Sequence, residues 1–509
     1  MPDVTKLVLT HLGALRGKYG GAGLVLVREA VRDLAAADSR RGIRTRLVAL
    51  DDGRTARALQ LPPVADAADH AGAKAYVDAA AARWSPDYLL LLGSPDVVPM
   101  QPLTNLLWTG DPRRGDPDES VPSDLPYACA APHSADPGDF RGATRVVGRL
   151  PDGTGSGDPG QLLTVLAVAT GYRSRRRADY LPPFALTAAE WLGSTTQTLQ
   201  RLLGDTAALQ AVPPAAPPWP ATQTRRRLHL MNLHGGPADP QYYGQRGRSF
   251  PVALAAADLA RGRNLLEGTV GAAESCYGGM LYDPAEAGGV PGFTDVYLAA
   301  GGYGYCASTN TAYGPADSND AADLVCRAFL QHVLAGGSLG RAMLQARQDY
   351  VFTKATLSPT DLKTLAQFTL YGDPSVHPVA RAQPAAAPAA DAGPPAGLAA
   401  RRRRLQANGE ALQSTTTRAA ATPREVTAGE RRRLADSVAA RLPAPGRGPR
   451  VALADAQLRT FDVVPAPAAG PGPGERFHVF LDRRPSGLRA VVAREEDGRI
   501  EQVALLLER

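Results

Sequence analysis

Cysteine is scarce in this sequence of 509 residues, which contains only four. None of the four lies in a C-x-x-C pair; they are Cys129, Cys276, Cys306 and Cys326. Scattered cysteines of this kind argue against both a disulfide framework and a zinc site. We therefore expect reduced thiols, and a reduced thiol can act as a nucleophile.

Long apolar runs are also missing. The sequence contains no run of about 18 consecutive apolar residues, the length that a membrane-spanning helix needs. Residues 1–6 lack the basic and then apolar layout of a secretory signal. We therefore expect a cytoplasmic protein with no membrane span.

Positive charge is present but clustered. The formal net charge is +6, and arginines gather at residues 175–177, 225–227, 401–404 and 431–433. Such clusters are typical of solvated faces. Phosphate binding is the alternative, but no interleaved aromatic residues support it, so we do not expect a nucleic-acid partner. The sequence makes no prediction of the oligomeric state.

Apolar runs alternate with helical patterns through the first 380 residues. Residues 88–93 (YLLLLG) form a continuous apolar run, which is typical of a parallel strand covered on both faces. Three further strands are expected at 228–233, 269–275 and 302–308. The sequence thus predicts an α/β fold with mostly parallel sheets in two tandem units, 1–155 and 156–380.

The rest of the chain has a different composition. Residues 381–425 are rich in Ala, Pro and Arg and are predicted to be a linker. Residues 426–509 are predicted to form a small, mostly β accessory domain. Within this domain we expect a hairpin across Asp497 and Gly498, a dipeptide that favours tight turns.

Two strand ends carry reactive side chains. One is the segment 230–236 (LMNLHGG) with His234, and the other is 271–279 (GAAESCYGG) with Cys276. Carboxyl ends of parallel strands meet at one edge of a sheet, so His234 and Cys276 are expected to share a crevice. A thiol beside an imidazole can supply a thiolate, and the imidazolium can protonate a leaving amine. The N–H groups of Cys276 and Gly235 are expected to face the developing oxyanion.

With flanking segments, these motifs make residues 5–380 resemble the gingipain-type peptidases of the caspase-like clan. The flanking segments are 89–99, 123–128, 147–151, 305–314 and 368–375. The resemblance implies a caspase-like three-layer αβα fold and a cysteine endopeptidase that forms a thioester on Cys276, with His234 as acid and base. Some relatives in this clan need calcium, so a calcium requirement stays open, although the sequence itself shows no cofactor or metal site.

Glu274 is the candidate for substrate selection. It stands two residues before Cys276, and the two-residue period of a strand puts both side chains on one side. An acidic residue at this place lies in the S1 pocket of metacaspases and legumains, so the resemblance implies a preference for Arg or Lys at P1. A solvated glutamate is the alternative. Asp317, Asp320 and Asp323 are weaker candidates, more typical of a loop and a helix N-terminus.

The segment after the third strand is expected to form the edge of the substrate cleft. Its candidate substrate-binding residues are Ser308, Thr309, Asn310 and Tyr313. An extended protein or peptide substrate would add there as a strand. Tyr313 is as typical of an ordinary loop aromatic.

Several questions stay open at this level. No acidic residue that would orient His234 is found in the sequence. A transpeptidase or sorting enzyme, and a catalytically silent caspase-like scaffold, are the alternative functions. The arginines at 225–227 and 401–404 are hypothetical autoprocessing sites, for which plain solvated loops are the alternative.

Overall fold

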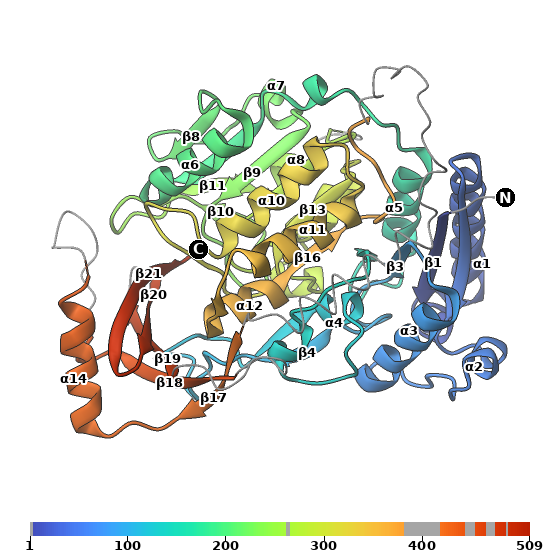
Figure 1. The fold of residues 1–509 in the computed structure, drawn as a ribbon. Coiled ribbons are helices and arrows are strands. Elements are labelled where there is room, and N and C mark those ends of the chain that lie inside the picture. Colours follow the sequence, from blue (N-terminus) through green and yellow to red (C-terminus); the bar gives the residue numbers. More distant parts are fainter. Residues whose placement is uncertain (1–3, 261–264, 381–417, 443–452, 465–473, 485–486) are drawn as a thin grey trace, which may run out of the picture.

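The computed structural model describes residues 4–260, 265–380, 418–442, 453–464, 474–484 and 487–509 (Figure 1). Its core is a ten-stranded sheet. In spatial order the strands are β2 (Ile43–Ala49), β1 (Val4–Thr10), β3 (Tyr88–Leu92), β6 (Val147–Leu150), β16 (Phe368–Tyr371), β13 (Gly304–Ser308), β12 (Val270–Ala273), β9 (Leu228–Asn232), β7 (Phe184–Ala188) and β8 (Leu209–Val212). Strands β3, β9, β12 and β13 are buried along their whole length, as expected for a sheet covered on both faces.

Strand direction divides this sheet into two halves. The first half is β2, β1, β3, β6 and β16, and the second half is β13, β12, β9, β7 and β8. Neighbouring strands are parallel throughout, except that β16 pairs antiparallel with β13. The carboxyl ends of the two halves therefore lie at opposite edges of the sheet. The predicted α/β class with mostly parallel strands is confirmed.

The expectation of two tandem units needs a correction, because both halves belong to one sheet. Strand β16 follows the second half in the chain, but it pairs with β6 of the first half as well as with β13. The four-residue strand β16 was not predicted from the sequence. Its partners lie far away along the chain, so no local pattern marks it.

Helices connect and cover the strands. They are α1 (Leu12–Arg40), α2 (Gly53–Leu59), α3 (His70–Trp84), α4 (Leu125–Ala128), α5 (Gly160–Gly171), α6 (Leu192–Leu203), α7 (Ala221–Thr224), α8 (Ala256–Leu259), α9 (Phe293–Ala299), α10 (Ala322–Leu334), α11 (Leu339–Phe352) and α12 (Pro359–Gln367). Helices α10 and α11 lie in front of β13 and β16 in Figure 1. Two short ribbons complete this part of the chain, β4 (Gln101–Thr104) with β5 (Ser120–Ser123) and β10 (Gln241–Tyr243) with β11 (Val252–Ala255).

A second sheet, antiparallel apart from one edge pair, contains the end of the chain. Its order is β14 (Tyr313–Gly314), β21 (Arg499–Glu508), β20 (Gly487–Glu496), β19 (Glu475–Arg484), β18 (Gln457–Val464), β17 (Arg418–Arg424) and β15 (Thr356–Leu357). The predicted hairpin is confirmed: Asp497 and Gly498 connect β20 to β21, and both have positive φ. The predicted mostly β character of this region is likewise confirmed.

The predicted linker extends too far. Residues 418–424 form β17, which pairs with β18 on one side and with β15 on the other. This segment, RAAATPR, has little intrinsic preference for a strand, so its partners determine its conformation. The remainder of the predicted linker, residues 381–417, lies outside the described residues.

Both faces of this second sheet are covered, so it is not a separate accessory body. Helix α14 (Ala428–Ala439) packs on one face, where Val438 contacts a cluster with Phe480 and Val491. On the other face, Phe461, Val479 and Leu488 belong to the same continuous core as the ten-stranded sheet.

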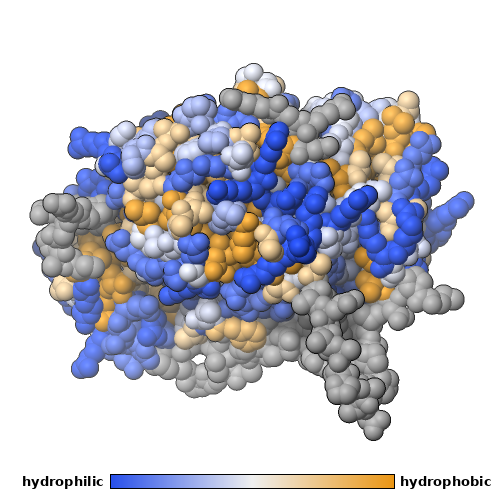
Figure 2. Space-filling view, turned by 90° about the horizontal axis from the view of Figure 1, so that it is seen from above, coloured by the Kyte–Doolittle hydropathy of each residue, from blue (hydrophilic) through white to orange (hydrophobic). Residues whose placement is uncertain are grey.

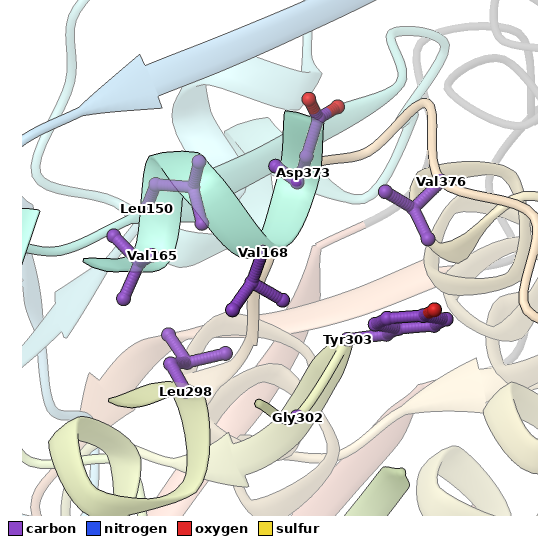
Figure 3. Close-up of a pocket in the computed structure, with 9 residues that line it drawn as sticks. Leu150, Val165, Val168, Leu298, Gly302, Tyr303, Asp373 and Val376 are labelled. Atoms are coloured by element: carbon purple, nitrogen blue, oxygen red, sulfur yellow. The ribbon is translucent and has the colours of Figure 1, made fainter. Parts of the chain in front are cut away.

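The hydrophobic core is closely packed. A cavity of about 10 Å³ lies between α5 and the loops near β16, lined among others by Val168, Leu298 and Tyr303 (Figure 3). Such a volume has room for about one water molecule. It is therefore a packing gap rather than a ligand site.

The surface carries no broad apolar area on the face seen from above, where hydrophobic patches alternate with hydrophilic residues (Figure 2). Within the described ranges, every helix is too short or too polar to cross a bilayer. Of the two hypothetical autoprocessing sites, residues 401–404 lie outside the described residues. Residues 225–227 directly precede β9, and two of the three arginines are partly buried, so cleavage there would cut at the start of a central strand.

The buried His229 makes a testable prediction about pH and stability. It lies on β9 with Phe184 and Tyr297 edge-on at 5.2 and 5.5 Å, and its Nδ1 bonds to the Tyr297 hydroxyl. Burial lowers its pKa from 6.5 to about 3. Because the folded pKa is below the unfolded one, this contribution to stability is complete above pH 6.5 and is lost as the pH falls toward 3.

We therefore expect His229 alone to reduce the free energy of unfolding by about 2 kcal/mol between pH 7 and pH 5. Urea unfolding of the wild type and of His229→Phe at both pH values measures this difference. The variant is expected to be less stable at pH 7 but to show the smaller pH dependence. An equal pH dependence in the two proteins would contradict the assignment.

Candidate active site

His234 and Cys276 follow two adjacent parallel strands, β9 and β12. Met231 lies opposite Ala273 in this pair, and the N–H of Glu274 donates to the Met231 carbonyl at 2.8 Å. A Cβ built on Gly235 would lie 2.1 Å from the carbonyl oxygen of Cys276, so the two loops touch at this glycine. The structure thus brings both residues to the carboxyl edge of the second half of the sheet.

The imidazole of His234 is held by aromatic rings and by one amide. Its ring centre lies 4.4 Å from that of Trp191 and 5.1 Å from that of Phe250. Gln245 donates from Nε2 to the carbonyl of Gly247 at 3.0 Å, which fixes the orientation of the amide. The Gln245 Oε1 therefore accepts the proton on Nε2 of His234, at 2.7 Å, and leaves Nδ1 as the free base.

Gln245 is the residue that the sequence analysis missed when it searched for an acidic partner of the histidine. Its side chain has no charge, so it orients the ring without stabilising the imidazolium strongly. Burial lowers the pKa of His234 from 6.5 to about 4, and the hydrogen bond that Nε2 donates to Gln245 opposes this only in part. The imidazole is neutral at physiological pH in this state.

Cys276 is buried and uncharged here. Its Sγ accepts a hydrogen bond from the N–H of Ala312 at 3.2 Å. Burial raises the pKa of the Cys276 thiol well above its usual value, and the nearby Glu508 carboxylate raises it further. Both members of the pair are therefore neutral, rather than a thiolate beside an imidazolium.

A buried pocket beside Cys276 contains the side chain of Arg509. Its guanidinium pairs with Glu274 through Nη1 and with Asp323 through Nη2, the latter at 2.8 Å. The same Nη2 lies 3.3 Å from the hydroxyl of Ser194. None of the three charged side chains is exposed. The guanidinium carbon also lies 5.5 Å from the ring centre of Trp191, where a cation is attracted to the aromatic face.

The shape and charge of this pocket suit a guanidinium. A Cβ built on Gly314 would lie 2.1 Å from Nη2 of Arg509, so this wall requires glycine. Burial and the neighbouring Asp323 raise the pKa of Glu274 well above its usual value, and the guanidinium opposes this. Glu274, the residue predicted to select the substrate, pairs with the guanidinium in this pocket. Asp323 stands in the first turn of α10, as expected, but its side chain is also a wall of the pocket.

The backbone of Arg509 is held as firmly as its side chain. Strand β21 pairs antiparallel with β14, with Glu508 opposite Tyr313. The N–H of Arg509 donates to the Ala312 carbonyl at 3.1 Å, and its carbonyl accepts from the N–H of Cys276 at 2.8 Å. The Cys276 N–H, a predicted oxyanion donor, is therefore occupied by the Arg509 carbonyl. Gly235 permits the close approach of the two loops, and its role as an oxyanion donor stays a prediction.

The four predicted cleft side chains do not face the pocket, which corrects the expectation. Their polar groups bond elsewhere: Ser308 to the Asn310 carbonyl at 2.7 Å, Thr309 to the Pro122 carbonyl at 2.7 Å, Asn310 to the Ser120 carbonyl at 3.1 Å and Tyr313 to Asp116 at 2.6 Å. After β13 the chain packs against β5, so these side chains are used inside the protein. The edge that pairs with β21 and Arg509 is the backbone of residues 312–314.

An ionic cluster beside Tyr277 holds the loop that follows β13. Lys363 lies between Asp116 and Asp118, at 2.5 and 3.0 Å. Asp118 in turn accepts from the Tyr277 hydroxyl at 2.6 Å and from the N–H of Thr311 at 2.9 Å. Burial alone would raise the pKa of Asp118, but Lys363 and these donors lower it below its usual value. Tyr277, directly after the nucleophile, has a left-handed φ of 55° that this cluster supports.

A second pocket, of about 390 Å³, has His234 as one of its walls. The second half of the sheet contributes His234, Gly235, Tyr243 and Phe250, and the C-terminal sheet contributes Arg483, Arg484, Gly487 and Glu508. It is separate from the pocket that contains the Arg509 side chain. Across the part of the chain that the structure describes, no three His, Cys, Asp or Glu side chains are grouped so as to hold a metal ion.

No protein-family model matches this chain, and no curated protein matches it significantly.

Proposed function

We propose that this protein is a caspase-like cysteine endopeptidase that cleaves after arginine, with Cys276 as nucleophile and His234 as acid and base. One observation carries the proposal. The guanidinium of Arg509 lies between two buried carboxylates while the carbonyl of the same residue accepts a hydrogen bond from the Cys276 N–H. This is the placement that a P1 residue needs for attack by the neighbouring thiol.

The proposed reaction uses the groups described above. Nδ1 of His234 takes the proton of the Cys276 thiol, and the thiolate attacks the P1 carbonyl carbon. The Cys276 N–H stabilises the negative oxygen, and the imidazolium then protonates the leaving amine as the C–N bond breaks. The resulting thioester is hydrolysed by a water whose proton His234 accepts. Gln245 keeps Nε2 protonated throughout, so Nδ1 remains the atom that exchanges protons.

The pocket also favours arginine over lysine. A guanidinium can reach Glu274 and Asp323 at the same time through two nitrogens, whereas an ammonium is a single point on a shorter stem. We expect a preference of roughly tenfold, the value of one charge-assisted hydrogen bond.

A panel of fluorogenic peptides that differ only at P1 tests the proposal. The enzymes are the full chain and the full chain with Arg509→Ala, in which the pocket has lost its occupant. The expected order of kcat/KM is arginine, then lysine, with leucine and aspartate far behind. A folded Arg509→Ala chain that cleaves none of them, or that cleaves all of them equally, would refute the proposal.

A transpeptidase is the second candidate, and the 390 Å³ pocket beside His234 favours it. An acceptor amine bound against His234, Tyr243 and Phe250, the walls of this pocket outside the C-terminal sheet, could resolve the thioester in place of water. Mass analysis of the products with and without a glycyl peptide as acceptor separates the two reactions. A catalytically silent scaffold would give neither the hydrolysed peptide nor the peptide joined to the acceptor.

A further inference from the structure

We infer that the C-terminal sheet is a built-in inhibitor of the site, with β21 in the place of a substrate strand and Arg509 in the place of P1. The inference rests on the proposed function. The segment that occupies the site belongs to this same chain. It is the described part of residues 418–509, a region that was predicted to be the end of a linker and an accessory domain.

The contacts of β21 match those of a bound peptide. It pairs antiparallel with the two-residue edge strand β14, Leu507 opposite Gly314 and Glu508 opposite Tyr313. Main-chain pairing of this kind is how extended peptides are recognised at an open sheet edge. Leu507 packs on Trp191, which also lies beside His234 and the guanidinium of Arg509. Figure 1 shows the end of β21 lying against the second half of the molecule.

The inhibiting strand is secured at several places outside the pocket. At the opposite edge of the sheet, β17 pairs with β15, which directly precedes α12. Arg459 and Arg483 donate to the carbonyls of Leu106 and Gly115, at 3.4 and 3.3 Å. One whole face of the sheet is part of the main core. Arg509 is therefore presented to the pocket at a high effective concentration, as for any tethered ligand.

Occupation has two consequences for the nucleophile. The Cys276 side chain is buried, so reagents and substrates cannot reach it. The Cys276 N–H is already used by the Arg509 carbonyl, so the oxyanion donor is blocked as well. An arginine substrate must displace β21 before it can be cleaved.

The test compares the full chain with two single variants, Arg509→Ala and Arg509→Lys. The matched control is Arg499→Ala, an exposed arginine at the start of the same strand. The first readout is the rate at which iodoacetamide alkylates Cys276, located by mass spectrometry. The buried thiols of Cys129, Cys306 and Cys326 report unfolding, since a chain that has lost its fold would be alkylated there too.

We expect Arg509→Ala to increase both the alkylation of Cys276 and the cleavage of an arginine-P1 peptide by roughly tenfold or more, because a tethered inhibitor occupies most molecules. Arg509→Lys should give a smaller increase, and Arg499→Ala none. Arg509→Lys keeps a cation in the pocket, so the test can still be carried out if Arg509→Ala does not fold.

The two proposals fail in different ways. Equal alkylation rates and equal, measurable peptide cleavage in all four folded proteins would overturn the inhibitor and leave the peptidase standing. Faster alkylation of Arg509→Ala with no cleavage of any peptide would overturn the peptidase, and with it the inhibitory role of the sheet.

Discussion

Cys276→Ala is expected to abolish peptide cleavage, with a loss of kcat on the order of 10⁴-fold or more, as for removal of other catalytic nucleophiles. The background is the full chain with Arg509→Ala, which is expected to open the site. In the structure the sulfur forms hydrogen bonds only with the backbone of Ala312. The substitution therefore removes little of the packing, and the fold is expected to stay intact.

The matched control is Cys129→Ala in the same background. Cys129 is also a buried thiol with one backbone partner, the Phe140 carbonyl at 3.0 Å, but it lies in the first half of the molecule. This variant should cleave the arginine-P1 peptide at the unaltered rate. Single-turnover assays with thermal unfolding as the folding check measure both. Substantial cleavage by a folded Cys276→Ala chain would refute the assignment of the nucleophile.

Glu274→Gln and Asp323→Asn are each expected to lower kcat/KM for an arginine-P1 peptide by about 10²-fold or more, again in the Arg509→Ala background. Each substitution leaves a buried guanidinium with one charged partner instead of two, and truncating one side of a buried charge pair costs roughly 2–5 kcal/mol. The leucine-P1 peptide should be affected much less, so selectivity as well as rate should fall.

Ser194→Ala provides the control for this pocket. Ser194 bonds to Asp323 at 2.5 Å and lies 3.3 Å from the guanidinium, but it has no charge. Its loss removes hydrogen bonds to charged groups but no charge, and is expected to cost roughly tenfold, less than the loss of a carboxylate. Unchanged selectivity for arginine in both carboxylate variants would place P1 in a different pocket.

The same pocket has a pH signature. Burial and Asp323 raise the pKa of Glu274, so protonation at low pH removes one of the two negative charges. Arginine binding should therefore weaken as the pH falls, and the Glu274→Gln variant should lack that part of the dependence. The measurement is KM for the arginine-P1 peptide across pH, in the Arg509→Ala background with and without Glu274→Gln.

Much of the site followed from local sequence patterns. Two strands that stop at His234-Gly and Cys276-x-Gly were predicted to meet, and the parallel pairing of β9 with β12 brings them together. The two-residue period of a strand was the reason to expect Glu274 and Cys276 on one side, although β12 ends at Ala273, before both residues. The Asp497–Gly498 turn predicted its hairpin for the same reason, since all three arguments use only neighbouring residues.

Other features of the site had no local signal. Gln245 is an ordinary polar residue until the Gly247 carbonyl orients its amide toward His234. The residues after β13 alternate like a cleft edge, yet their side chains face β5, because packing against the first half decides which way they point. The residues around Asp323 predict only the start of a helix. Its contact with the Arg509 guanidinium appears only in the tertiary structure.

The sequence by itself therefore determined the α/β class and the meeting of the two strand ends that carry His234 and Cys276, because strand period and turn chemistry act over a few residues. Only the tertiary structure decided that β16 joins the halves into one sheet and that Arg509 occupies the pocket of Glu274, 235 positions away. Contacts at such separations depend on how whole sheets pack, and that packing is determined by many residues at once rather than by any motif.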